Sequence, residues 1–201
     1  MSQAEISAKD VKTLRDRTGA PILACREALS EANGDFERAV DILRARGEAQ
    51  AAKRAGAEAT EGTVQSYIHA GNKIGVLVEV DCQTDFVARN ERFIEFARDV
   101  ALHIAAAAPL AVSDDDIPAD VREREERIAA EQLANVPEQA RERAIAGKLD
   151  SWFDEVVLLR QKHVNQDKYE GKTIEELRAA LVAETGENIV IRRFARFAVG
   201  G

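Results

Sequence analysis

The side chains best suited to catalysis or metal binding are few and lie far apart in the sequence. The 201-residue chain has three histidines (His69, His103 and His163) and two cysteines (Cys25 and Cys82). They form no CxxC pair and no spacing typical of a zinc site. The sequence also has no glycine-rich phosphate loop and no nucleophile elbow. We therefore predict no metal site, no cofactor and no bond-making or bond-breaking chemistry, so the chain is not expected to be an enzyme.

The same residues have simpler structural interpretations. Cys25 belongs to an apolar stripe and is expected to act as a small buried hydrophobe. His103 lies near the apolar face of a long predicted helix, and we expect it to be packed. His163 lies in a polar helix end, and we expect it to be solvated.

The most unusual segment is Asp81–Asn90, which reads DCQTDFVARN at a predicted strand-to-helix junction. Two interpretations stay open. In the first, Thr84 or Asp85 caps the helix and Phe86 packs into the core. In the second, Phe86 projects from the first helical turn as a rigid aromatic anchor beside Asp85, the kind of residue that protein interfaces favour. Periodicity does not decide between them.

Three short helices are predicted before this segment. Ser7 is a good N-cap for the first helix, and Gly19 ends it. Pro21 suits the first turn of the second helix, Asp35 caps the third, and Gly47 is expected to close it. The apolar positions recur at helical spacing, as a core-facing stripe requires: Val11 and Leu14, then Cys25, Ala28, Leu29 and Ala32, then Phe36, Ala39, Val40 and Leu43. A partly helical linker is expected over residues 48–60.

The remaining elements predict a small sheet with helices. The apolar period changes to two over Val64–Ile68 and Ile74–Val80, which flank a Gly-containing turn and so predict a β-hairpin. A long helix is expected from Thr84 to about Ala107, and a final strand carries Ile189, Ile191 and Phe197 on one face and Val190 and Phe194 on the other. An α+β fold with a three-stranded antiparallel sheet follows. Its second face would be apolar, so we expect a second copy of the chain to cover it, giving a homodimer.

Charged residues dominate the segment between the long helix and the last strand. A turn at Asp114–Pro118 and two helices over about 114–150 predict an exposed helical arm. A further helix is expected over roughly 150–162, and another is capped by Thr173 and ends near Gly186.

Composition excludes some classes of function. The formal net charge of −8 argues against a protein held to nucleic acid mainly through phosphates. No stretch has the roughly 20 apolar residues of a membrane span. Met1–Glu5 show no secretory pattern, and the cysteines suggest no disulfide framework. We therefore expect a cytoplasmic protein with a protein partner.

Several segments, in order, resemble the elongation factor Ts family over nearly the whole chain. The most specific is Gln83–Arg89 (QTDFVAR). The others are Leu14–Ala20 (LRDRTGA), Ala28–Asp35 (ALSEANGD), Tyr67–His69 (YIH), Ile74–Val80 (IGVLVEV) and Gly186–Phe194 (GENIVIRRF). The length is similar to that of the short bacterial form of this family, which has half of the larger core and is expected to pair.

The resemblance implies a guanine nucleotide exchange factor for elongation factor Tu. Such a factor binds the GDP complex of its partner, dislodges Mg²⁺ and promotes GDP release so that GTP can bind. Residues 1–55 would be a three-helix module similar to a ubiquitin-associated (UBA) fold, and residues 56–201 the core, with the arm at about 114–150. The alternative is a UBA-type adaptor that binds polypeptide ligands without exchange activity.

The resemblance also implies roles for particular residues. Thr84, Asp85, Phe86 and Val87 would act on the Mg²⁺ site of the partner. Lys12, Arg15, Ile22, Leu23, Arg26 and His69 would contact the partner. Two segments depart from the family pattern: Pro21–Ala24 replaces the usual Gly-Met-Met-Asp, and Gln161–Val164 replaces the usual Gln-Pro-Phe-Val. No partner contact is assigned to the second.

Overall fold

The computed structural model describes residues 6–200, apart from the side chain of Glu48, so the prediction made for Met1–Glu5 lies outside it. The chain divides into two compact units, each made of three segments. The first comprises Met1–Gln65, Glu79–Ala97 and Glu176–Ile191, and the second Ser66–Val78, Arg98–Glu175 and Arg192–Gly201. Helices and a three-stranded sheet confirm the predicted α+β class.

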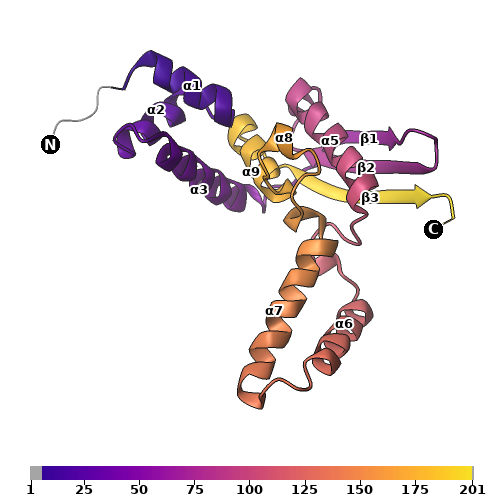
Figure 1. Cartoon of the computed structure of the whole chain (residues 1–201). Coiled ribbons are helices and arrows are strands. Elements are labelled where there is room, and N and C mark those ends of the chain that lie inside the picture. The colour runs from indigo at the N-terminus through magenta and orange to yellow at the C-terminus, as the bar shows by residue number, and fades with distance from the viewer. Residues whose placement is uncertain (1–5, 201) are drawn as a thin grey trace. The chain divides into compact units, whose positions relative to one another are not determined.

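Three helices open the first unit and pack together: α1 (Ala8–Thr18), α2 (Ile22–Glu31) and α3 (Phe36–Arg54) (Figure 1). Their core is the predicted set of apolar positions: Val11, Leu14, Cys25, Ala28, Leu29, Ala32 and Ala39 are buried, with Phe36, Val40 and Leu43 partly buried beside them. The prediction that Cys25 is buried is therefore confirmed, and burial raises the pKa of its thiol.

Local sequence signals set the ends of these helices. Ser7 and Asp10 form a capping box at the start of α1, each accepting a hydrogen bond from the backbone N–H of the other at 3.1 Å. Gly19 ends α1 with φ = 72°, a left-handed conformation that glycine adopts without steric cost. The carboxylate of Asp35 accepts from the backbone N–H of Arg38 at the start of α3.

The prediction that Gly47 closes the third helix is wrong, because α3 continues to Arg54. Gly47 is buried, and a methyl group there would lie 3.8 Å from the carbonyl oxygen of Ala179 in α9 (Ile174–Thr185). Glycine costs about 1 kcal/mol in a helix interior. The helix nevertheless continues, with α9 packed against it at Gly47 and an ion pair between Arg44 and Glu176.

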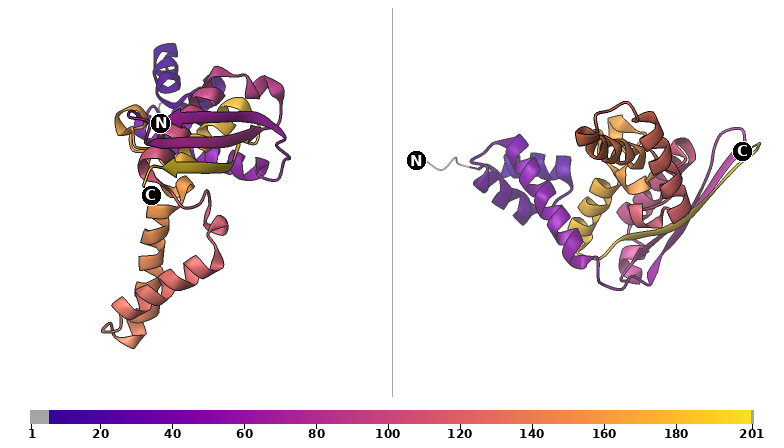
Figure 2. Two further views of the ribbon diagram at one scale, coloured as in Figure 1. Left: turned by 90° about the vertical axis from the view of Figure 1, so that its right-hand side faces the viewer. Right: turned by 90° about the horizontal axis from the view of Figure 1, so that it is seen from below.

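The sheet contains β1 (Glu61–Ile68), β2 (Ile74–Cys82) and β3 (Val190–Ala198), with β2 in the middle (Figure 2). The predicted hairpin is thus confirmed. The backbone N–H of Val199 donates to the carbonyl of Lys73 at 2.8 Å, so β3 runs antiparallel to β2.

One face of the sheet is buried and the other carries exposed apolar side chains. Val76 and Val78 are buried, whereas Leu77 is exposed. A methyl group on Gly75 would lie 3.0 Å from the side chain of Ile68, so Ile68 shares the exposed face with Leu77. On β3, Ile191 is buried whereas Phe197 is 70% exposed.

The long helix predicted after Thr84 is interrupted. The structure has a short α4 (Asp85–Ala88) and then α5 (Glu91–Ala107). The side chain of Asn90 accepts a hydrogen bond from the backbone N–H of Arg92 at 2.8 Å, which caps a new helix start. One face of α5 is buried and carries Phe93, Phe96, Ala97, Val100 and Ile104.

Two antiparallel helices form the arm: α6 (Ala119–Gln132) and α7 (Glu138–Val156), side by side in both figures. The separate helix predicted over 150–162 is wrong, because α7 runs through to Val156. Val157 then adopts an extended conformation and forms a β-bridge with Ala111, which stops the helix. The next turn is a short 3₁₀ helix, Leu158–Arg160.

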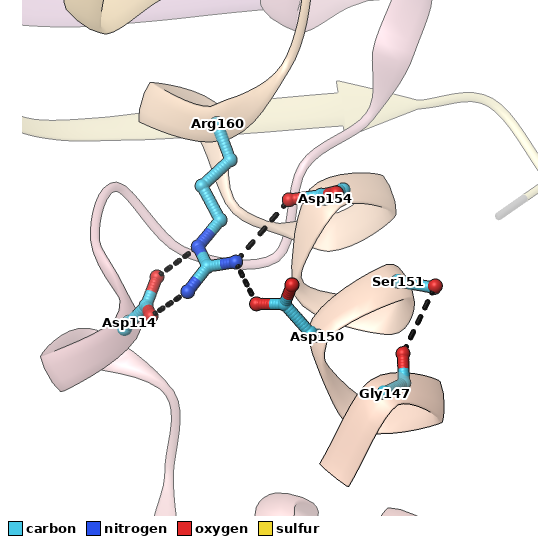
Figure 3. Close-up of polar contacts among 6 residues, drawn as sticks. All are labelled: Asp114, Gly147, Asp150, Ser151, Asp154 and Arg160. Carbon is cyan, nitrogen blue, oxygen red and sulfur yellow. Dashed lines mark hydrogen bonds and ion pairs between the residues drawn. The ribbon is translucent and has the colours of Figure 1, made fainter. Parts of the chain in front are cut away.

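Arg160 joins the two ends of the arm (Figure 3). Its guanidinium donates two hydrogen bonds to Asp114, at 2.8 and 2.6 Å, where the arm begins. It also donates to Asp150 at 2.6 Å and Asp154 at 3.2 Å, in the last turns of α7. These carboxylates, Asp114 first, raise the pKa of Arg160. The guanidinium also lies 5.3 Å from the ring centroid of Phe153.

His163 is buried, so the prediction that it is solvated is wrong, while the prediction that His103 is packed is confirmed. The two rings lie 5.3 Å apart. His163 Nε2 donates to the carbonyl of Asp99 at 3.0 Å, and its ring makes a T-shaped contact with that of Tyr169 in α8 (Gln166–Tyr169). The sequence could not indicate this burial because Asp99 lies 64 residues away.

The hydrogen-bond partners of His103 fix its tautomer. The carboxamide of Gln161 donates to the carbonyl of Glu155, so its oxygen faces His103 and accepts from Nε2 at 2.8 Å. The backbone N–H of Val164 donates to His103 Nδ1 at 3.2 Å. Both ring nitrogens of His103 are thereby used, one as donor and one as acceptor.

Candidate functional site

Phe86 projects from a short turn of helix into solvent. Its side chain is 83% exposed, the largest exposure among the described large apolar side chains. The interpretation in which Phe86 packs into the core is therefore wrong. The turn around it is well formed, since Thr84 caps it by accepting from the backbone N–H of Val87, and the N–H of Ala88 donates to the carbonyl of Thr84 at 3.1 Å.

Charge and shape around the ring are defined by its neighbours in the chain. Asp85 lies beside Phe86 and pairs with Arg89 at 3.1 Å, one turn along. Both charged groups are largely exposed, so this ion pair contributes little to stability. The structure thus brings Thr84, Asp85, Phe86 and Val87 together on one turn, with an aromatic ring at its tip and a carboxylate at its side.

A second segment, residues 187–188, is hydrogen-bonded to the residues just before this turn. Glu187, in the loop between α9 and β3, accepts hydrogen bonds from the backbone N–H groups of Gln83 and Thr84, both at 3.0 Å, and from the Thr84 hydroxyl at 2.6 Å. The backbone N–H of Asn188 donates to the side-chain oxygen of Gln83 at 2.9 Å. We call these four hydrogen bonds the Glu187 clamp.

Sequence reasoning missed the Glu187 clamp. Gly186–Phe194 carried a resemblance, but no role was assigned to the carboxylate within it. The available signal was a glycine followed by a carboxylate and an amide just before a strand.

Burial, with the nearby Glu187 charge as the next cause, raises the pKa of the adjacent Cys82 thiol to about 11, so that thiol is inert at neutral pH.

The predicted contact residues of the three-helix module are all on its surface. Lys12 and Arg15 are exposed on α1, one turn apart. On α2, Ile22 and Leu23 are exposed large apolar side chains, and Arg26 is exposed within one turn of both. The module therefore presents apolar groups and cations together, a combination suited to a protein surface that is apolar and acidic.

His69 lies in the other compact unit, at the turn between β1 and β2. It is exposed, and its Nδ1 lies 3.1 Å from the Tyr67 hydroxyl. Which of the two groups donates in this hydrogen bond depends on the tautomer of the imidazole. Because it is exposed, His69 is available for contact.

Within residues 6–200, no group of three or more His, Cys, Asp or Glu side chains is arranged to hold a metal ion. Over the same residues, the structure contains no helix with the length and apolar character of a membrane span.

Comparison with known proteins gives one family. The family model described as "Elongation factor TS" matches residues 27–170. Elongation factor Ts of Desulfotalea psychrophila is 52% identical over 97% of this chain and 98% of its own length. That of Caldanaerobacter subterraneus is 48% identical over 97% of both. That of Thermosynechococcus vestitus is 50% identical over 98% of this chain and 66% of its own length. The chain therefore belongs to the elongation factor Ts family.

Proposed function

We propose that this protein is a guanine nucleotide exchange factor for elongation factor Tu. It binds the GDP complex, dislodges the Mg²⁺ ion that helps to hold the nucleotide, and so promotes GDP release and GTP binding. The observation that carries the proposal is the exposure of Phe86 on a capped turn. Because this ring is not packed in the core of its own chain, it can enter a partner without unfolding any part of this protein. A side chain of this kind is suited to act as a wedge.

The physical basis is thermodynamic coupling between two ligands of one partner. If the exchange factor weakens GDP binding by a given factor, GDP weakens binding of the exchange factor by the same factor. Typical couplings of 1–3 kcal/mol correspond to roughly 5- to 150-fold. Neither complex is then a dead end, and the exchange factor needs no acid, base or nucleophile of its own.

Two regions share the work in this proposal. The three-helix module, residues 1–55, docks on the partner through Lys12, Arg15, Ile22, Leu23 and Arg26, and the core adds a contact at His69. The turn Thr84–Val87 then acts on the Mg²⁺ site. Support comes from family membership and from the exposure of seven of these side chains: Lys12, Arg15, Ile22, Leu23, Arg26, His69 and Phe86.

The test is the release rate of labelled GDP from elongation factor Tu at saturating exchange factor. Phe86→Ala should slow release by about tenfold or more, the effect of removing a central aromatic anchor. Leu110→Ala, which truncates another exposed apolar side chain, is the matched control and should release GDP at the wild-type rate. A folded Phe86→Ala variant with the wild-type rate would rule out the wedge.

The exposed pair Ile22 and Leu23 also fits the alternative of a UBA-type adaptor that binds polypeptides without exchange. Excess GDP separates the two functions. A pull-down of elongation factor Tu from a bacterial lysate should weaken when GDP is added if the protein is an exchange factor. An adaptor would retain its ligand equally well with and without the nucleotide.

We further propose a homodimer formed through the exposed face of the sheet. Ile68, Leu77 and Phe197 expose apolar surface there, and a small sheet is stabilised by a second layer. Light scattering at micromolar concentration should give twice the 22.0 kDa mass of one chain. Phe197→Asp should shift the protein to the monomer, and a wild-type monomer would rule out the dimer.

A further inference from the structure

We propose that Glu187 is a positioning residue for exchange: it touches no partner atom, but it fixes the turn that presents Phe86. The inference rests on the proposed exchange function. All the residues involved belong to one compact unit.

Both carboxylate oxygens of Glu187 accept hydrogen bonds from the segment before the turn. Oε2 accepts from the N–H groups of Gln83 and Thr84, and Oε1 accepts from the Thr84 hydroxyl. These donors stand immediately before the first residue of α4, where backbone N–H groups have no helical partner. The side chain that satisfies them therefore also sets the direction in which the helical turn starts.

The clamp matters because the turn is too short to hold itself. The helix α4 has four residues, and isolated helical turns are unstable in water. The ring of Phe86 is 83% exposed, so packing around the ring itself provides little restraint. The restraint comes from the other end, where Glu187 fixes residues 83 and 84 and Thr84 in turn caps Val87.

The segment that carries Glu187 is itself anchored. Asn188 is buried, its backbone N–H donates to Gln83, and its side-chain amide donates to the carbonyl of Ala57 at 2.8 Å. On the other side, the N–H of Gly186 donates to the carbonyl of Val182 at the end of α9. Because this support is anchored, the direction of the Phe86 side chain is set by contacts outside α4 and not by the four residues of α4 alone.

A pair of substitutions separates geometry from charge. Glu187→Asp keeps the negative charge but is one methylene shorter, so it cannot reach all three donors. Glu187→Gln loses the charge but keeps the reach: its oxygen can accept from both backbone N–H groups, and its amide can donate to the Thr84 hydroxyl. Glu184→Asp shortens another carboxylate of the same region, which pairs only at 3.8 Å with Arg92, and is the matched control.

The measurement is GDP release from elongation factor Tu over a range of exchange-factor concentrations, with thermal unfolding of each variant. Glu187→Asp should lower the maximal rate by about fivefold, as expected when residues in contact are uncoupled, and leave the half-saturating concentration unchanged. Glu187→Gln and Glu184→Asp should keep rates within about twofold of wild type. A loss in Glu187→Gln without loss in Glu187→Asp would show that charge acts, and would overturn the inference.

Introducing Glu187→Asp into the Phe86→Ala variant separates an effect on the ring from an effect on folding. If Glu187 acts only through the ring, Glu187→Asp should cause no further loss of rate once the ring is absent, whereas any effect on stability would persist. An equal fractional loss in both backgrounds would overturn the inference. If Phe86→Ala alone has the wild-type rate, the proposed wedge function fails instead, so the two failures are distinguishable.

Discussion

The contacts of Arg160 predict a measurable and specific contribution to stability at the base of the arm. Replacing Arg160 by Met removes the guanidinium but keeps an unbranched side chain. Four hydrogen bonds to Asp114, Asp150 and Asp154 are lost, and three carboxylates are left without that cation. We expect the free energy of unfolding of this unit to fall.

The size of the effect follows from exposure. The Arg160 side chain is 31% exposed and its three partners are more so, so each ion pair is screened by water. Exposed pairs contribute about 0.2–1 kcal/mol each, and three of them near the middle of that range give about 1–2 kcal/mol. For a protein of this size, that is a fall in melting temperature of roughly 2–8 °C.

Arg122→Met is the matched control. The guanidinium of Arg122 also lies 5.3 Å from the Phe153 ring, but it takes no part in the Arg160 cluster. The difference between the two variants therefore isolates the ion pairs from the cation–ring contact. Equal losses of stability in the two variants would refute the reasoning.

Urea unfolding followed by tryptophan fluorescence is a suitable assay. Trp152 is the single tryptophan of the chain, and its ring lies 5.2 Å from that of Phe153 at the base of the arm. The difference between Arg160→Met and Arg122→Met should shrink in 1 M salt, where the Debye length falls to about 3 Å. A difference that does not change with salt would show that packing, not charge, is responsible.

Two further predictions concern the sheet and the buried histidines. Gly62→Ala should lower the free energy of unfolding by about 2 kcal/mol or more, because its methyl group would lie 2.3 Å from the carbonyl oxygen of Val80; Gly56→Ala, with open space around it, should change stability by less than about 0.5 kcal/mol. Burial lowers the pKa of His103. The neutral form is thus favoured in the folded state, so stability is complete above the ordinary histidine pKa of about 6.5 and should fall as pH drops towards 5. Urea unfolding midpoints at pH 7.5 and 5 measure this loss of stability. The control is His69→Ala, which removes an exposed histidine and should retain the wild-type pH dependence. A wild-type midpoint that does not change with pH would contradict the prediction.

Features set by neighbouring residues were predictable from the sequence. The N-caps Ser7 and Asp35 and the stop at Gly19 act within one turn of helix, so the residues that determine them are adjacent in the chain. The hairpin and the buried stripes followed in the same way from periodicity. The candidate turn was also located, although the position of the Phe86 ring was left open because the first turn of a helix has no fixed inward side.

Three of the errors share a cause, which is contact with a distant segment. Gly47 looked like a helix stop, but α9 packs against it and the helix continues. His163 looked solvated, but the carbonyl of Asp99 pairs with it inside the second unit. The role of Glu187 depends on donors about 100 residues earlier in the chain. Single-sequence patterns do not contain such contacts.

The Glu187 clamp also has a consequence for biosynthesis. The partners in it are separated by 103 to 105 positions in the chain. A nascent polypeptide emerges from its amino end, so the three-helix module can fold early while Gln83 and Thr84 wait for residues that have not yet been translated. The turn that carries Phe86 can therefore be held in place only after residues about 100 positions later have been translated.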